Sequence, residues 1–259
     1  MSSTPRFLTR PPLIFLSIVL ALALFAPAPF AVIAPGPATN LLGNTVSISS
    51  GASATVLPTK GKLFSTSVLV NNPNSRLPGI WVLLAWAKGS QAVVPWSALY
   101  PPGESAKKSK EVSDKEMATS QQKAAIAAAN FLKALNPSQP LGWNPKDIKI
   151  AMHNVGGPSA GLAFALTLIA KLKSPELIAG RNIAVTGEIS ENGSVGRIGG
   201  IDQKMIGARA AGAQIFILPR QTCQDITRRP KGLKLIAVST LGQAVHALAN
   251  PRIADSLHC

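Results

Sequence analysis

The chain has 259 residues, of which 46% are hydrophobic and 14% are charged; this composition is typical of one folded domain or two small ones and excludes a largely disordered chain. Its formal net charge of +15 favours an anionic neighbourhood, such as membrane head groups, wall polymers or acidic substrates. Basic residues run through the whole sequence, without the clustered basic face and interleaved aromatics of a nucleic-acid reader, so no nucleic-acid partner is expected.

The N-terminal segment has a cationic start followed by a long apolar stretch. No charged residue lies between Arg10 and Lys60, and residues 12–34 are almost wholly apolar. This pattern predicts one N-terminal transmembrane helix over residues 12–34, with the membrane as its partner. Because arginine favours the cytoplasmic side of a span, residues 1–11 are predicted to form a cytoplasmic tail.

A cleaved signal peptide is the alternative interpretation of the same segment. Ala26-Pro27-Ala28 follows a short apolar core and has the small-x-small form of a cleavage site. Pro27 and Pro29 complicate both interpretations, because proline kinks or ends a helix. Under either one, residues 35–259 are predicted to lie outside the cytoplasm, held at the cell membrane or secreted.

Residues 35–136 are predicted to form a β-rich N-terminal part that ends in a helix. The expected strands are residues 45–49, 63–70 and 80–85. The polar, proline-containing residues 101–115 are expected to form an exposed loop. Thr119 and Gln122 have the spacing of a capping box, which predicts a helix from there to about residue 136.

Residues 137–259 are predicted to form the catalytic part, with alternating strand and helix patterns. A glycine-rich segment around Ser159 leads into residues 159–173, which are apolar on nearly every side and therefore predict a buried central helix. Asn192 and Gly193 predict a tight hairpin turn. The other expected strands are residues 147–152, 183–189, 195–198, 215–218 and 233–238, and the other expected helices are residues 202–211 and 240–250.

Two chemistries compete for Ser159. Its pentapeptide satisfies G-x-S-x-G, the nucleophile elbow of α/β-hydrolases, for which Asp225 and His246 follow in the required order. An elbow needs a buried strand directly before it, whereas the approach here is polar and broken by glycine. The alternative partner is Lys204. Metal binding is not expected, because the sequence has no CxxC and no HExxH and its 3 histidines show no ligand spacing.

The interval from Ser159 to Lys204 resembles the proteolytic domain of Lon-type proteases in four linked blocks. A glycine-rich loop alone would be weak evidence, but loop, strand, hairpin and helix in the family's order are specific. The blocks are GPSAG at residues 157–161, VTGEI at residues 185–189, VGRIGGI at residues 195–201, and QKM at residues 203–205, which continues through ARAAG to the strand ending ILP at residues 217–219.

This resemblance implies an α+β fold like that of ribosomal protein S5 domain 2, with a mixed sheet and packed helices, here preceded by the transmembrane helix. It implies a serine endopeptidase with Ser159 as nucleophile and Lys204 as general base. The sequence has no Walker A motif, so the activity is expected to be independent of ATP, and no cofactor is expected. The remaining active-site residues that it implies are Thr186, which would orient the lysine, Glu188 on the same strand face, and Gly157, Pro158 and Ala160 around the nucleophile.

A lysine can act as a general base only if its pKa falls from about 10.4 toward 7 or 8. Lys204 lies in the first turn of its predicted helix, where the helix dipole disfavours an ammonium group. The neighbouring Ile201, Met205 and Ile206 are apolar and favour burial, which acts in the same direction. Backbone amides around Ser159, at the start of a helix, are the expected donors to a tetrahedral oxyanion.

The resemblance is nearest to the membrane-anchored bacterial PDZ-Lon-like proteases and covers residues 35–259. That family carries a PDZ domain between the helix that precedes the serine block and the next strand, whereas only residues 137–146 join them here. We therefore expect one continuous peptidase domain with protein or peptide substrates. A homo-oligomeric ring like that of Lon, and a non-catalytic binding protein on the same fold, both stay open.

The chain has 2 cysteines, Cys223 and Cys259. A small even number in an exported protein can form one disulfide, and two free thiols are the alternative. Both positions resemble ones that the PDZ-Lon-like family uses, which favours the disulfide.

Overall fold

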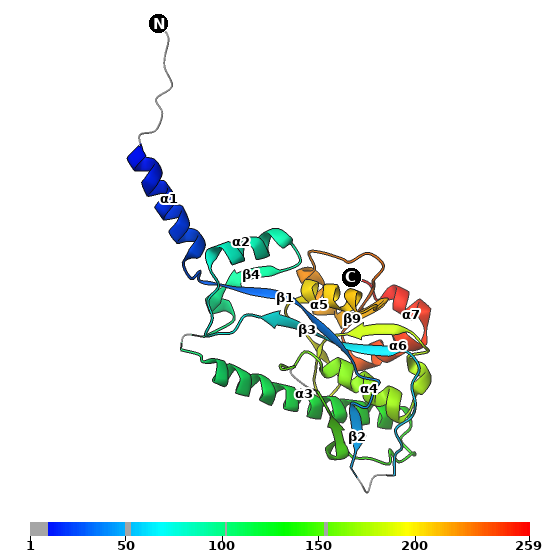
Figure 1. The fold of residues 1–259 in the computed structure, drawn as a ribbon. Helices are drawn as coiled ribbons and strands as arrows, with labels where there is room; N and C mark the ends of the chain where they lie inside the picture. The colour runs from blue at the N-terminus through cyan, green and yellow to red at the C-terminus, as the bar shows by residue number, and fades with distance from the viewer. Residues whose placement is uncertain (1–9, 50–52, 102, 153–154) are drawn as a thin grey trace. The chain divides into compact units, whose positions relative to one another are not determined.

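The computed structural model in Figure 1 describes residues 10–49, 53–101, 103–152 and 155–259. The chain divides into two compact units. The first unit consists of Met1–Ile33 and Val70–Ala106, and the second of Ala34–Leu69 and Lys107–Cys259. Strand β1 (Phe30–Asn40), strand β3 (Lys62–Val70) and helix α3 (Ala106–Leu135) are the elements in which the chain passes from one unit to the other.

The first unit contains two helices and a short strand pair. Its elements besides β1 are helix α1 (Arg10–Phe25), helix α2 (Gly79–Lys88), strand β4 (Ala92–Pro95) and the 3-10 helix η1 (Trp96–Ala98). β4 runs antiparallel to the start of β1, with Phe30 opposite Pro95 and Ile33 opposite Ala92. Residues 30–33, directly after α1, are therefore paired with a second strand.

The predicted transmembrane helix over residues 12–34 is wrong as one continuous helix. α1 ends at Phe25, and the following Pro27 and Pro29 have no amide hydrogen to continue it. Residues 30–33 belong to β1 instead, where Ala31 and Val32 are buried. Among the residues that the structure describes, no helix has both the length and the apolar character needed to cross a membrane.

Residues 80–85, predicted as a strand, lie in α2 instead. A short apolar run has no decisive period, so it fits a strand and a buried helix equally well. The residues at the two ends of this run favour the helix. The helix begins after Pro78 and ends at Gly89, whose φ of 63° is the left-handed conformation that closes many helices.

The second unit is built on a sheet with the strand order β10-β9-β6-β3-β1. Strands β6 (Asn182–Val185), β9 (Ile215–Pro219) and β10 (Lys234–Val238) are parallel along β3. Two small antiparallel pairs accompany this sheet: β2 (Val46–Ile48) with β5 (Ile148–Ile150), and β7 (Glu188–Ile189) with β8 (Val195–Gly196). The result is a mixed α/β fold, in which a mixed sheet carries packed helices.

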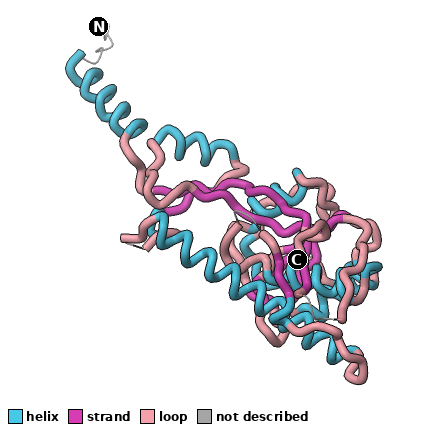
Figure 2. Tube along the Cα trace, turned by 60° about the horizontal axis from the view of Figure 1, so that its bottom comes forward, coloured by secondary structure: helices cyan, strands magenta, loops and turns pink. Residues whose placement is uncertain are grey.

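Helices cover both faces of this sheet, as Figures 1 and 2 show. Ile183 and Val185 of β6 join a core with α3, α4 (Gly161–Leu172) and α6 (Leu241–Ala249). Ala184, which lies between them, joins a second core around α5 (Ile201–Ala210). Side chains alternate between the two faces of a strand, so the sheet separates two apolar cores. The shorter helices of this unit are η2 (Pro145–Asp147), η3 (Pro175–Leu177), η4 (Arg220–Asp225) and α7 (Pro251–Ser256).

Helix α4 is buried along its whole length, which confirms the prediction of a central helix after Ser159. Lys171 near its end is buried as well, and its Nζ donates to the carbonyls of Leu42 and Gly43 at 2.8 Å each. Burial lowers the pKa of this lysine, and the two carbonyls satisfy the buried ammonium group. α4 therefore has no freedom to shift along its axis without breaking these bonds.

Helix α3 begins at Ala106, well before the predicted start at Thr119, so the loop predicted over residues 101–115 is wrong from Ala106 onward. This stretch is polar, but its charges are spaced for a helix. Lys110 Nζ lies 2.6 Å from the Asp114 carboxylate one turn later, and pairs of this spacing stabilise exposed helices. α3 then connects to β5 through residues 136–147, which contain only η2.

The packing of α5 against β1 makes a testable prediction at Gly207. A Cβ built at this position would lie 2.4 Å from the carbonyl oxygen of Gly36 in β1, whereas at the exposed Gly43 it would meet nothing within 4 Å. Gly207→Val is expected to lower the free energy of unfolding by about 2 kcal/mol, because strand and helix are forced apart. Gly43→Val is the control and should change it by less than about 0.5 kcal/mol. Urea denaturation of both variants measures the difference, and equal effects would contradict the close approach.

Candidate active site

The loop that carries Ser159 is held in place by α3 and by the segment after β6. Ser120 Oγ of α3 donates to the carbonyl of Pro158 at 2.9 Å, and the amide of Gly157 donates to the carbonyl of Ser113 at 3.0 Å. On the other side, the amide of Gly187 donates to the Ser159 carbonyl at 2.8 Å. These bonds fix the backbone of the loop that carries Ser159 from two directions, just before α4 begins.

Helix α5 brings Lys204 to Ser159. The lysine Nζ lies 2.8 Å from Ser159 Oγ and 3.3 Å from Thr186 Oγ1. Thr186 Oγ1 in turn donates to the Ser159 carbonyl at 3.3 Å. Three residues proposed from separate blocks of the sequence thus form one connected cluster at the carboxyl end of β6.

Lys204 is withdrawn from water. Its side chain is 3% exposed, and Thr186 and the adjacent Met205 are both 0% exposed. Burial lowers the pKa of Lys204 from its usual value to about 8, while the negative charge of Glu188 acts in the opposite direction. A lysine with this pKa is partly neutral near physiological pH, so it can accept a proton from a neighbouring hydroxyl group.

Glu188 and the backbone amides around Ser159 contribute to the site in different ways, the first by its charge and the second as hydrogen-bond donors. Glu188 is exposed on β7 and acts on Lys204 through its charge. The Gly157 amide is already bonded to Ser113, and Pro158 has no amide hydrogen. Among the described residues, the amides of Ser159 and Ala160 donate to no acceptor. These two amides, directly before α4, are therefore the ones available to an oxyanion.

A cavity of about 140 Å³ opens beside Ser159 and Lys204. One wall is formed by residues 66–69 of β3, and the other by Val155, Gly156 and Ala160. β6 pairs with β3 only through residues 62–65, so β3 continues past the end of its neighbour along the cavity. Thr66 Oγ1 is buried here without a hydrogen-bond partner in the described structure.

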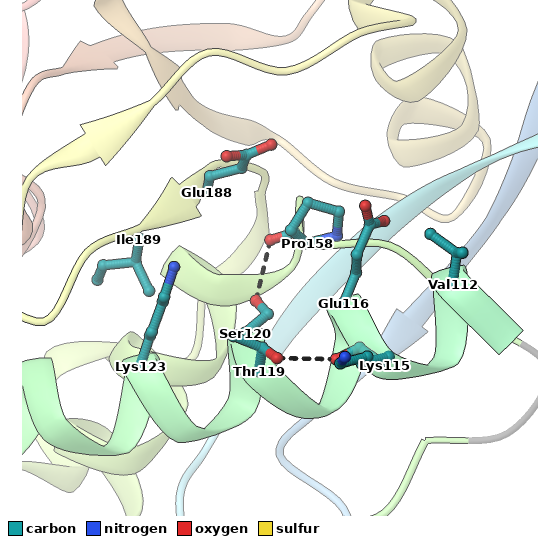
Figure 3. Close-up of a pocket in the computed structure, with 9 residues that line it drawn as sticks. All are labelled: Val112, Lys115, Glu116, Thr119, Ser120, Lys123, Pro158, Glu188 and Ile189. Carbon is teal, nitrogen blue, oxygen red and sulfur yellow. Dashed lines mark hydrogen bonds between the residues drawn. The ribbon is translucent and has the colours of Figure 1, made fainter. Parts of the chain in front are cut away.

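A larger groove of about 560 Å³ lies between α3 and β7, on the other side of Pro158. Figure 3 shows Glu116 and Lys123 extending from α3 toward Glu188 and Ile189 of β7, with the Ser120 bond to Pro158 between them. The lining carries charges of both signs, since Lys115 also belongs to it. The groove thus reaches the loop that carries Ser159 at Pro158.

The alternative triad is not assembled. Asp225 pairs with Arg197, whose Nε donates to it at 2.9 Å, and His246 lies on α6. Within the described residues, neither is hydrogen-bonded to Ser159, whose hydroxyl oxygen faces Lys204. Among the described residues shortly before the serine, the strand is β5, which pairs with β2 and not with the main sheet, whereas an α/β-hydrolase elbow follows a strand of the main sheet. His258 lies at the C-terminal end, and His153 lies outside the described residues.

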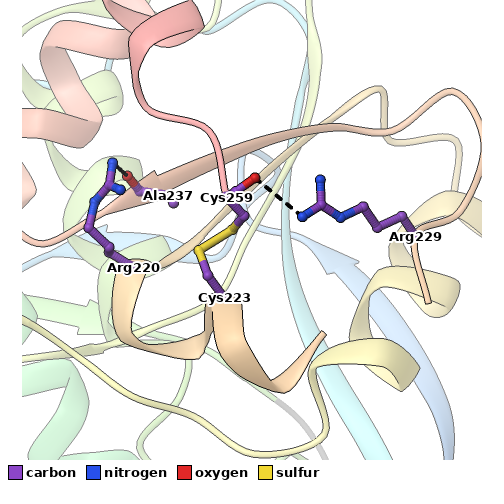
Figure 4. Close-up of a disulfide and its surroundings, with 5 residues drawn as sticks. All are labelled: Arg220, Cys223, Arg229, Ala237 and Cys259. Carbon is purple, nitrogen blue, oxygen red and sulfur yellow. Dashed lines mark hydrogen bonds between the residues drawn. A yellow bond between two sulfur atoms is a disulfide. The ribbon is translucent and has the colours of Figure 1, made fainter. Parts of the chain in front are cut away.

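Cys223 and Cys259 are joined in a disulfide, with their Cα atoms 5.4 Å apart. Figure 4 shows Arg229 beside it, donating to the carbonyl of Cys259 at 3.3 Å. Cys259 also packs against the core that contains Met205. The bond therefore holds the C-terminal end against the same apolar cluster that buries Lys204.

Several contributors to the site were missed from the sequence. Ser113 contributes its backbone carbonyl, and Thr66 contributes by its position on β3 beside the cavity. Neither residue belongs to a recognisable sequence motif. Ser120 lies within the helix predicted from Thr119, but its residue type did not indicate the bond to Pro158. Contacts made by backbone atoms leave almost no mark on residue type.

Comparison with known proteins finds similarity to Lon proteases, in agreement with the resemblance seen in the sequence. A sequence profile of the Lon protease (S16) C-terminal proteolytic domain matches residues 103–250. The chain is 32% identical to Lon protease 2 of Bacillus subtilis over 132 residues, which are 49% of this chain and 24% of that protein. It is 34% identical to Lon protease of Haemophilus influenzae over 117 residues, which are 43% of this chain and 13% of that protein. The chain thus spans no more than about a quarter of the length of these relatives.

The burial of Lys204 predicts a pH-dependent stability. The unfolded chain holds the lysine proton up to about pH 10.4, whereas the folded chain releases it near pH 8. The folded state is therefore penalised below pH 8, and this penalty is relieved as the pH rises from 8 to about 10.4. Lys204→Met is expected to be more stable than the parent at pH 7, with an advantage that shrinks by pH 10. Urea denaturation at both pH values measures this, and a pH-independent difference would contradict it.

Proposed function

The chain belongs to the family of the Lon protease C-terminal proteolytic domain, and from that premise we propose that it is a serine endopeptidase that uses Ser159 and Lys204. The observation that carries this proposal is the 2.8 Å contact between Lys204 Nζ and Ser159 Oγ in a place where the lysine is almost fully buried. Serine needs a base to become a nucleophile, and a lysine with a pKa of about 8 can be that base.

The proposed reaction has two stages. Neutral Lys204 accepts the hydroxyl proton as Ser159 Oγ forms a bond to the scissile carbonyl carbon. The lysine then gives this proton to the leaving amine nitrogen as the C–N bond breaks, which leaves an acyl-enzyme ester. Water attacks the ester while the lysine takes its proton, and that proton returns to Oγ when the acid product leaves. Thr186 holds the lysine nitrogen in line through its 3.3 Å contact.

The developing oxyanion needs donors that are not already engaged. The amides of Ser159 and Ala160 meet this condition, as described above, and they lie at the positive end of α4. Removal of one such donor in a serine protease costs roughly 10² to 10³ in rate. The Gly157 amide is left out of this role, because its bond to Ser113 positions the loop instead.

A peptide fits the cavity better than a compact ester does. Residues 66–69 of β3 extend past the end of β6 beside Ser159, so an extended peptide could pair with their backbone as an added strand. The cavity continues along that strand, which suits cleavage within a chain. We therefore infer that the substrates are extended or unfolded protein segments, cleaved without ATP because the sequence has no Walker A motif.

We also propose that the enzyme acts outside the cytoplasm, with α1 as its export or membrane-attachment segment. Two observations support this location. Arg6 and Arg10 precede an apolar stretch without charges, which is the pattern of segments recognised by the export machinery. The disulfide between Cys223 and Cys259 suits an oxidising compartment.

The proposed dyad predicts the outcome of single substitutions. Ser159→Ala and Lys204→Ala should each lower the rate of hydrolysis of unfolded casein by about 10³-fold or more, because each removes a group that takes part in bond formation. Circular dichroism should show both variants folded. A folded variant of either kind with undiminished activity would refute the assignment.

His246→Ala and His258→Ala are the matched controls and should keep the parent activity. If His246→Ala lost acylation with its fold intact, a triad with histidine would replace the dyad. A fluorophosphonate probe gives a second readout, since its adduct should map by mass spectrometry to Ser159 and should be absent after Lys204→Ala. If the folded parent failed both to label and to cleave, the non-catalytic binding role would be supported instead.

The proposed location predicts the redox state of the cysteines. Chain purified from its native host and alkylated without a reductant should show no modified thiol, and after reduction it should show two. Two alkylated thiols before reduction would contradict an oxidising compartment. Cys223→Ser with Cys259→Ser should lower the free energy of unfolding by about 3 to 4 kcal/mol according to the chain-entropy estimate for a separation of 36 residues.

A further inference from the structure

Helix α2 of the first unit has no polar face. Val82 and Ala85 are buried, and the helix packs on β4 through that side. The opposite side exposes four large apolar side chains: Trp81 is 59% exposed, Leu83 52%, Leu84 46% and Trp86 73%. A helix that is apolar all round needs a second apolar environment besides its own domain.

α2 is firmly joined to α1. The amide of Gly79 donates to the carbonyl of Ala26 at 3.2 Å, and a Cβ built at Gly79 would lie 2.2 Å from the carbonyl oxygen of Ala23. α1 itself exposes an apolar surface that includes Phe15 at 69% and Phe25 at 70%. The outer face of α2 is therefore not an isolated apolar patch, because the neighbouring helix α1 also exposes apolar side chains to solvent.

The charges around α2 indicate what covers it. Arg76 precedes the helix and Lys88 ends it, and in the described part of the first unit the only acidic residue is Glu104. Tryptophan beside cationic side chains is the composition that proteins place at the boundary between lipid head groups and acyl chains, and each cation near an anionic surface adds to the attraction.

A second protein chain is a poorer occupant for this face. α2 is about 15 Å long, and its four outer side chains alone offer less area than the roughly 800 Å² that each partner of a stable complex buries, so a protein partner would have to extend over α1 as well. A lipid boundary has no such minimum, since every buried apolar side chain contributes by itself. The first unit also lacks the mixture of acidic and basic residues that forms the polar rim of protein interfaces.

We propose that α2 is an interfacial docking helix, whose outer face of Trp81, Leu83, Leu84 and Trp86 inserts into the boundary region of a membrane that contains anionic phospholipid. The helix lies in the membrane surface and does not cross it, with β4 covering its inner side. The first unit is thereby held at the membrane by its folded part as well as by α1. This role does not depend on the proposed catalytic activity.

Tryptophan fluorescence of the full chain tests the proposal. The chain is bound to vesicles of phosphatidylcholine and phosphatidylglycerol, with or without bromine on the acyl chains as a contact quencher. The chain has 4 tryptophans, and two of them are on the outer face, so brominated lipid should remove about half of the emission. Trp81→Phe with Trp86→Phe keeps the face apolar and should abolish most of this quenching, because Trp143 is buried and Trp96 lies in η1, outside the inserted helix.

A matched pair of charge variants provides the second arm. Trp86→Asp should prevent insertion and so protect Trp81 from brominated lipid. Leu135→Asp, at a similarly exposed apolar position on α3 of the second unit, should leave the quenching unchanged. Parent emission that is insensitive to brominated lipid, or equally quenched after Trp86→Asp, would overturn the proposal. So would a crosslinker placed at residue 86 that joins two copies of the chain in place of lipid, since the face would then be a self-association surface.

Discussion

The removal of one lysine side chain from water is the constraint on which the second unit depends. Burying an ammonium group in an apolar core is costly unless it deprotonates or finds partners. Lys204 does both, since burial lowers its pKa to about 8 and its Nζ forms hydrogen bonds with the hydroxyl oxygens of Ser159 and Thr186. Such burial requires apolar packing around the aliphatic part of the side chain. The core around α5 supplies it from one face of the sheet, and the core around α4 closes the site from the other.

The two cores meet where β6 ends. The sequence suggests one strand over residues 183–189, but β6 ends at Val185, and after the Thr186 amide has bonded to Ile217 of β9 the chain leaves the sheet before β7. This interruption frees backbone groups that would otherwise pair with a neighbouring strand. The Gly187 amide and carbonyl bond to Ser159 and Leu162 instead. The irregular point in the sheet is thus the point that docks the nucleophile loop, as is common where parallel strands end.

The sequence was sufficient for elements whose pattern is local. The buried α4, the hairpin at Gly193 and the helix of Lys204 were all predicted from periodicity and turn residues. It was insufficient for α2, since an apolar run of six residues has no decisive period. It was also insufficient for the start of α3, where only ion pairs between residues one turn apart, such as Lys110 and Asp114, distinguish a helix from a loop. In the site, motif residues could be named, whereas Thr66 contributes by its place on β3 and only the fold brings it there.

The contact between Gly156 and Ser113 links two positions that lie far apart in the sequence. A Cβ at residue 156 would lie 2.1 Å from Ser113 Oγ, so a side chain can occupy one of these positions only while the other stays small. A larger residue at 156 therefore requires that the Ser113 side chain or the loop of Ser159 shifts. Residues 113 and 156 are coupled in size, so the sequence of α3 limits the sequence of the loop that carries Ser159.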